Sequence, residues 1–268
     1  MTVEGHVGVA RTLAYTREGA GVPLVFLHGL GAARGQAQAA IADVRGIERI
    51  TIDAPAHGES AGSPVALNFR SFAYAVLQLL DALGIEQAIL GGISMGSGIA
   101  LRIAVEAPER VRSLVLSRPA WIDEPGRPHL DLVSDLGYWI TAGGLKAARQ
   151  RLVSDPRHQQ IARVAPLAGA SVVKTIDAVA ATGRPDVLSA MVDSWPVDDL
   201  TELRSFIKPA LVISTEHDPL HPKHIADRLA SALPNASTLV APPRYLEPDR
   251  HQAAVTTAID SFVAQHHR

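Results

Sequence analysis

The chain has 268 residues, 47% of them apolar, and a formal net charge of −2. This fits one folded domain, and without a basic block there is no electrostatic support for a nucleic-acid partner. Cysteine is absent, which excludes disulfides, thiolate metal sites and a cysteine nucleophile. No apolar run reaches the ~18–20 residues of a membrane span. The first residues lack the pattern of a signal peptide, so we expect a cytoplasmic protein. The preference for arginine over lysine is typical of a GC-rich bacterial genome.

Short apolar runs rich in β-branched residues alternate with longer helical patterns. The strand-like runs cover residues 23–27, 47–52, 87–92, 111–117, 210–214 and 238–241, and apolar residues recur at helical spacing over 69–83, 98–107 and 249–264. The segment before residue 20 is typical of an antiparallel edge hairpin. This alternation predicts an α/β protein with a mostly parallel, doubly wound sheet covered on both faces.

The alternation breaks between residues 118 and 205. Helical patterns dominate there, such as 145–153 and 171–181, and the stretch is too long for an ordinary connection. We therefore predict a core formed by residues 1–117 and 206–268, with a helical lid inserted at 118–205. The alternative is a set of surface helices with no role over a site.

Gly92-Ile93-Ser94-Met95-Gly96 joins a predicted strand to a predicted helix. Glycines two residues before and after the serine permit a sharp turn, and the helix N-terminus favours a developing negative charge. This context predicts that Ser94 is a nucleophile; the alternative is an idle serine in a glycine-rich turn.

His28-Gly29-Leu30-Gly31 closes the first core strand. Its glycines let the backbone curl so that an amide points at a reacting oxygen. We expect the amides of Leu30 and Met95 to bind the oxyanion, with His28 and Gly29 beside the substrate. For His28 itself, a structural role in the turn is favoured over a role as acid or base.

Four segments in this order resemble the α/β-hydrolase superfamily, in particular its lid-containing esterase, haloperoxidase-like and lactonase branches. They are His28-Gly29-Leu30-Gly31, Asp53-Ala54-Pro55-Ala56-His57-Gly58-Glu59-Ser60, Gly92-Ile93-Ser94-Met95-Gly96 and Ala107-Pro108-Glu109-Arg110-Val111. The resemblance implies the α/β-hydrolase fold and a triad in the order serine, acid, histidine. It does not imply a substrate, because this superfamily hosts many chemistries. Its epoxide hydrolases and haloalkane dehalogenases use aspartate where this chain has Ser94.

The acid that this resemblance implies is Asp218, which follows the strand-like run 210–214. Glu216 and Asp123 are the alternatives. The family's histidine lies just after the last strand, where this chain has Pro242. His251 is the histidine between the last strand and the C-terminal tail, and we predict it as the base. A surface or interhelical position for His251 is the alternative.

Three more histidines, His217, His221 and His224, cluster near the predicted acid. They lack the carboxylate partners of a convincing metal site, so we expect neither a metal nor a cofactor.

Residues of the lid and of nearby loops are candidates for the pocket wall. Trp121 and Trp139, together with Tyr138 and Trp195, are expected either to line an apolar acyl pocket or to pack within the lid. Arg118 follows a strand directly; a surface or loop role is favoured for it, and a position at the pocket is the alternative. A loop-shaping role near the pocket rim is favoured for His57.

The sequence therefore predicts a cofactor-free serine hydrolase that cleaves a carboxylic ester, a lactone or a related small to medium apolar acyl compound. We expect a small-molecule substrate, no nucleic-acid or membrane partner, and a monomer or homodimer. The alternative is a protein of the same fold with a degenerate triad, either a ligand-binding protein or a non-hydrolytic lyase or cyclase. The position of the catalytic histidine separates these hypotheses.

Overall fold

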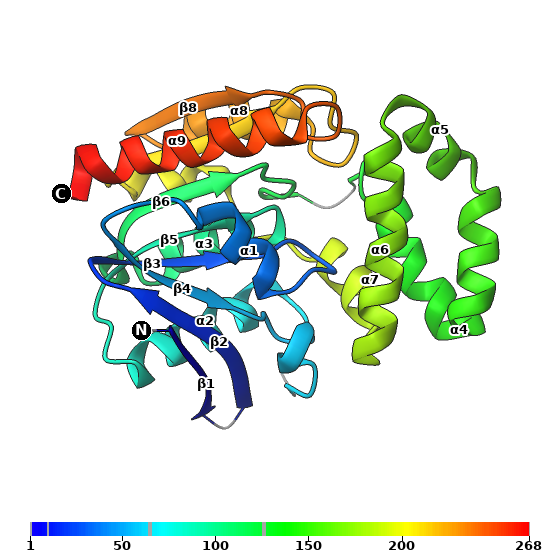
Figure 1. Cartoon of the computed structure of the whole chain (residues 1–268), viewed down its shortest axis with the longest axis horizontal. Helices are drawn as coiled ribbons and strands as arrows, with labels where there is room; N and C mark the ends of the chain where they lie inside the picture. Colours follow the sequence, from blue (N-terminus) through cyan, green and yellow to red (C-terminus); the bar gives the residue numbers. More distant parts are fainter. Residues whose placement is uncertain (1, 10, 64–65, 125–126, 268) are drawn as a thin grey trace.

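A computed structural model describes residues 2–9, 11–63, 66–124 and 127–267 of the chain. A sheet of eight described strands lies at the centre, in the order β1-β2-β4-β3-β5-β6-β7-β8 (Figure 1). The strands are β1 (Thr2–Val9), β2 (Arg11–Gly19), β3 (Val22–Leu27), β4 (Ile47–Ile52), β5 (Ala88–Ile93), β6 (Val111–Ser117), β7 (Ala210–Thr215) and β8 (Ala236–Ala241). β2 pairs antiparallel with both β1 and β4, whereas the strands from β4 to β8 pair parallel. The predicted edge hairpin and mostly parallel sheet are confirmed.

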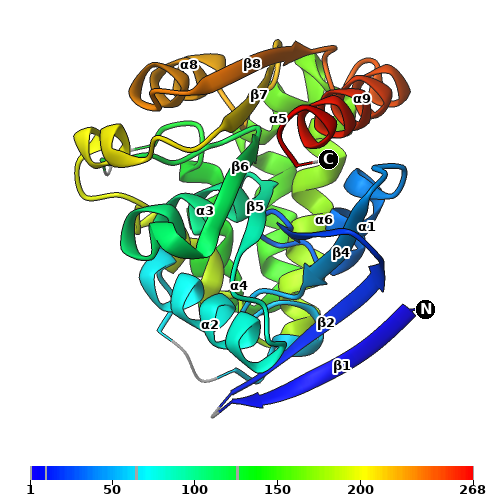
Figure 2. The ribbon, with the colours of Figure 1, turned by 90° about the vertical axis from the view of Figure 1, so that its left-hand side faces the viewer.

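Helices cover both faces of this sheet. α1 (Arg34–Ile41) and α9 (Pro248–His267) lie on one face, and α2 (Phe69–Ala82), α3 (Met95–Glu106) and α8 (Lys223–Ala232) lie on the other (Figure 2). In β3, Leu24 and Phe26 pack on the side of α1 and α9, while Val25 and Leu27 pack on the opposite side. Because successive side chains of a strand point to opposite faces, a run buried on both sides is apolar throughout.

The insertion between β6 and β7 is helical and lies beyond the carboxyl ends of the parallel strands (Figure 1). Its helices are α4 (Asp131–Ser154), α5 (Pro156–Val164), α6 (Pro166–Thr182) and α7 (Asp186–Val192). Three short 3₁₀ turns complete the secondary structure at Gly58–Ser60, Pro108–Arg110 and Leu200–Ser205. Gly144, at φ 75°, interrupts α4. In the described part of the chain, no helix combines the length and apolar composition needed to cross a membrane.

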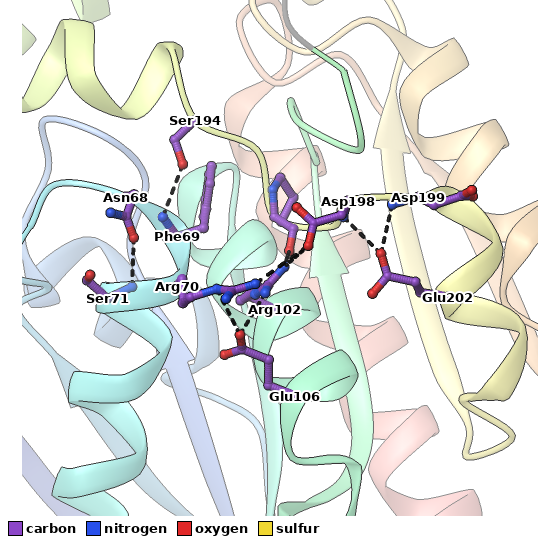
Figure 3. Close-up of polar contacts among 11 residues, drawn as sticks. Asn68, Phe69, Arg70, Ser71, Arg102, Glu106, Ser194, Asp198, Asp199 and Glu202 are labelled. Carbon is purple, nitrogen blue, oxygen red and sulfur yellow. Dashed lines mark hydrogen bonds and ion pairs between the residues drawn. The ribbon is translucent and has the colours of Figure 1, made fainter.

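The return from the lid to the core is fixed by polar contacts with α2 and α3 (Figure 3). The Phe69 amide donates to Ser194 Oγ at 3.2 Å. Arg102 of α3 contacts Asp198 at 3.2 Å and Glu106 at 2.6 Å. Since α3 begins directly after Ser94, the last residues of the lid are held against the helix that carries the predicted nucleophile.

Candidate active site

Ser94 lies in a sharp turn between β5 and α3. Its φ and ψ are 54° and −108°, a conformation that residues other than glycine rarely adopt outside functional sites. Its amide donates to the Ser117 carbonyl at the end of β6, 2.9 Å away. A Cβ atom on Gly92 or Gly96 would lie 2.6 or 2.4 Å from the Leu27 carbonyl oxygen. The turn therefore needs glycine at both positions, as the sequence pattern predicts.

Ser94 lines a cavity of about 80 Å³ at the carboxyl ends of the strands. This is small beside the roughly 300–1,000 Å³ of sites that take drug-sized ligands, so the cavity suits a small molecule. Both the core and the lid contribute to its wall, which includes Gly29, Leu30, Ser94, Arg118, Trp121, Val133, Ser171, Val172, Thr175, Leu220, His221, Arg244 and Tyr245.

The loop after β3 brings backbone amides close to the serine. A Cβ atom on Gly29 would lie 3.6 Å from the Ser94 Cβ. Within the described segments, the amides of Leu30 and Met95 are not used in any hydrogen bond with another residue. Free amides beside a nucleophile are what an oxyanion hole requires. The roles of Leu30 and Met95 in binding an oxyanion stay predictions.

Asp218 follows β7 and is buried at the edge of the cavity. Its Oδ1 accepts a hydrogen bond from the Leu220 amide at 3.0 Å. Its Oδ2 lies 2.9 Å from His221 Nδ1 and 3.4 Å from Arg118 Nη1. Burial raises the pKa of this carboxyl, but His221, Arg118 and the amide outweigh burial and hold the pKa well below its usual value. Asp218 is therefore a carboxylate at neutral pH.

His221 lines the same cavity as Ser94, three residues after Asp218. Since a carboxylate only accepts hydrogen bonds, we assign the ring proton to Nδ1, which leaves Nε2 with its lone pair. Burial lowers the pKa of His221 below its ordinary value, although Asp218 opposes this shift. The ring is therefore neutral at pH 7. No hydrogen bond among the described residues joins Ser94 Oγ to His221, although both residues line the cavity.

His251 does not form the hydrogen bonds predicted for the base in the described residues. α9 begins at Pro248, and the His251 amide donates to the Glu247 carbonyl at 2.9 Å. This first turn places the buried ring under the β8–α9 loop, where Nδ1 donates to the Pro242 carbonyl at 2.8 Å. Burial lowers the pKa of His251 to about 4. His251 is not among the described residues that line the cavity with Ser94, and no hydrogen bond joins the two side chains in the described part of the chain.

The other predicted histidines hold the loops around the site. His28 is fully buried; its Nδ1 donates to the Gly29 carbonyl at 2.8 Å and its Nε2 accepts from the Ala54 amide at 3.0 Å. His57 Nε2 accepts from the Gly31 amide at 3.1 Å. Both nitrogens of His28 are thus engaged within the turn, and His28 is not among the described residues that line the cavity; its contact with a substrate stays a prediction.

Of the four aromatic residues considered for the pocket, Trp121 lines the cavity. Trp139 does not; it packs within the lid, where the Arg151 guanidinium lies 4.6 Å from its ring centre. Tyr138 and Trp195 are exposed. The expectation that Trp139 binds substrate is not supported, because its ring is directed into α4 contacts instead of the cavity.

Arg118 and Arg244 also line the cavity. From the sequence another role was favoured for Arg118, and Arg244 was not considered. Arg118 lies in the connection after β6 and is 3% exposed, so it is not on the surface, and it lines the cavity. Arg244 comes from the β8–α9 loop, with its Cζ 5.9 Å from the ring centre of Tyr245. The position of Arg118 directly after a parallel strand was the available signal, because such strand ends converge on one edge of a sheet.

The alternative acids lie elsewhere. Glu216 is exposed, and Asp123 pairs with Arg228 at 3.1 Å. No group of three or more histidine, aspartate or glutamate side chains that could hold a metal ion gathers in the described part of the chain.

Comparison with known proteins agrees with this architecture. A model of the alpha/beta hydrolase fold family matches residues 22–245. A putative non-heme haloperoxidase from Mycobacterium phage D29 is 34% identical over 125 residues, which are 46% of this chain and 43% of that protein. A 2-hydroxymuconate semialdehyde hydrolase from Pseudomonas putida is 27% identical over 234 residues, covering 82% of this chain and 78% of that protein. The chain spans less than half the length of the first curated relatives it matches.

Among solved structures, a thermophilic esterase from Thermogutta terrifontis, with malate bound, has a TM-score of 0.76 at 21% identity, with 100% of both chains covered. At this identity the likeness concerns the fold alone. With the family model matching most of its length, the chain belongs to the α/β-hydrolase family.

Proposed function

We propose that this protein is a serine hydrolase that cleaves a carboxylic ester, a lactone or a related small acyl compound through an acyl-enzyme. The observation that carries the proposal is the shared cavity: Ser94, on its strained turn, and His221, held by Asp218 at 2.9 Å, line the same small space. Relatives named as hydrolases support the reaction class.

Each group then has one chemical task. Ser94 Oγ attacks the carbonyl carbon while His221 Nε2 takes its proton. Asp218 holds Nδ1–H and stabilises the imidazolium that forms. The amides of Leu30 and Met95 donate to the oxyanion. His221 returns the proton to the leaving alcohol, and water activated by the same ring releases the acid from Ser94. The base is thus His221 and not the predicted His251.

A fluorophosphonate probe tests this function without knowledge of the substrate. The probe should label the peptide that contains Ser94, and Ser94→Ala should lose the label while keeping its thermal unfolding midpoint. Ser97→Ala is the matched control, because Ser97 Oγ is buried and bonded to the Gly92 carbonyl at 2.7 Å. Labelling at another residue, or none, counts against a serine hydrolase.

One observation favours a second candidate, a degenerate triad on the same fold. Ser94 Oγ has no hydrogen bond to a histidine in the described residues, so no base is in place to take the proton of its hydroxyl. A ligand-binding protein, or a lyase or cyclase that moves protons with His221 alone, fits that arrangement. Such a protein would bind small molecules in the cavity yet resist the probe.

A further inference from the structure

The wall of the cavity beside Ser94 carries an excess of positive charge. Arg118 and Arg244 both line it, from the ends of β6 and β8. No aspartate or glutamate belongs to the described cavity wall. Asp218 is the one carboxylate in contact with either arginine among the described residues, and it reaches only Arg118. Two guanidinium groups therefore line one small cavity, and the single described carboxylate that contacts them, Asp218, reaches Arg118 and not Arg244.

Arg118 is held in place at a cost. It is 3% exposed and has φ 47°, a left-handed conformation that is strained for a residue other than glycine. Its buried Nε has no hydrogen-bond partner in the described structure, and such an unpaired donor costs stability. Its amide donates to the Ile213 carbonyl at 2.7 Å, which fixes the strained residue at the end of β6. Strain and an unused donor of this kind concentrate at functional sites.

Arg244 also lacks an acidic partner. It forms no ion pair with any described residue, whereas the nearby Glu247 pairs with Arg250. Burial and the positive charge of Arg118 both lower the pKa of Arg244, with the Tyr245 side chain and Asp218 opposing them. Two mutually repelling cations in a largely enclosed space are stabilised by an anion between them.

We propose that Arg118 and Arg244 form an anion subsite, and that the substrate is a small ester or lactone carrying a free carboxylate near its scissile carbonyl. This inference rests on the proposed function and narrows its substrate class. A planar guanidinium matches a carboxylate with paired hydrogen bonds. The carboxylate would align the scissile carbonyl on Ser94, and the small cavity restricts the group to a few bonds from that carbonyl.

A matched pair of esters tests the subsite. Monomethyl succinate carries the carboxylate, and methyl levulinate replaces it with a neutral acetyl group of the same size. In the wild-type protein, kcat/KM should be higher for the anionic ester. Arg244→Gln should lower the ratio of the two kcat/KM values about 10- to 100-fold, the effect of losing a hydrogen bond to a charged group. Because the ratio compares two substrates on one protein, a change in folded fraction cancels.

Arg250→Gln is the control, since Arg250 is exposed, pairs with Glu247 and lies outside the described cavity wall. It should leave the ratio unchanged. A wild-type ratio near one, or a ratio that survives Arg244→Gln, would overturn the subsite. If neither ester is hydrolysed, the fluorophosphonate probe decides the proposed function, and calorimetric titration of succinate decides the subsite separately. Binding that Arg244→Gln abolishes supports it, and no binding to the wild-type protein refutes it.

Discussion

Replacing His221 by glutamine, beside the same change at His251, tests which histidine is the base. A glutamine amide at 221 can still donate to Asp218, now bonded at 2.9 Å, so the buried carboxylate keeps a partner. A glutamine at 251 can likewise donate to the Pro242 carbonyl, bonded at 2.8 Å. Both variants therefore preserve volume and hydrogen bonding, and they differ in whether the lost ring lines the cavity.

The expected losses differ widely. Removing a positioned general base lowers kcat by a factor of about 10²–10⁴. The kcat of His221→Gln should therefore be lower than that of the wild type by a factor in this range. His251→Gln removes a ring nitrogen that bonds only a loop carbonyl, which contributes about 1 kcal/mol to stability. Its kcat should stay within about threefold of wild type, since the chemical step does not use the ring.

Initial rates with p-nitrophenyl acetate give kcat, and thermal unfolding of each variant checks that the fold is intact. His221→Ala adds a positive test: free imidazole should restore part of its activity, and should not restore that of Ser94→Ala. The reasoning is refuted if His251→Gln loses about a hundredfold while His221→Gln keeps near-normal kcat. In that case the base would be His251, brought to Ser94 by a rearranged β8–α9 loop.

Three further outcomes follow from the same contacts. Asp218→Asn should lower kcat by up to about 10⁴, because the amide favours the wrong imidazole tautomer; a loss below about tenfold would assign the orienting role elsewhere. Neutral His221 is the active form and burial lowers its pKa, so kcat/KM should rise with pH through a midpoint below 6.5; a midpoint above 6.5 contradicts this. Gly96→Ala should reduce the urea-derived free energy of unfolding by about 1–3 kcal/mol through overpacking, whereas Gly62→Ala, with no atom within 4 Å of its Cβ, should change it far less.

The strands and the turn at Ser94 could be predicted because residues close together in the sequence determine them. A strand buried on both faces has to be apolar along its length, as residues 24–27 of β3 are. The turn at Ser94 requires glycine where a Cβ would meet the Leu27 carbonyl. In contrast, α1 was not predicted, because alanine and polar residues dominate it and leave only a weak helical stripe of large apolar side chains. The shorter α8 was not predicted either, although Ile225 and Leu229 lie four residues apart on its buried face.

The proposed base, His221, could not be predicted, because its place in the site depends on how two loops fold. Spacing after the last strand favoured His251, but nothing in the sequence reveals that the first turn of α9 directs its ring to Pro242. His221 stands three residues after Asp218 in a proline-bounded turn, a separation that brings the two side chains together. That spacing was visible, yet it was considered only for metal binding. The role of Arg244 depends likewise on the path of its loop into the cavity.

The placement of Asp218 and His221 within one turn has an evolutionary consequence. The turn is closed by its own backbone contact, from the His221 amide to the Asp218 carbonyl at 3.4 Å. The mutual geometry of carboxylate and imidazole is thus inherited as a single short segment, independent of insertions or helix shifts near the C-terminus. In the proposed mechanism the β8–α9 loop does not supply the proton acceptor, so this loop can diversify between descendants and change which ligands are recognised without altering the Asp218–His221 pair.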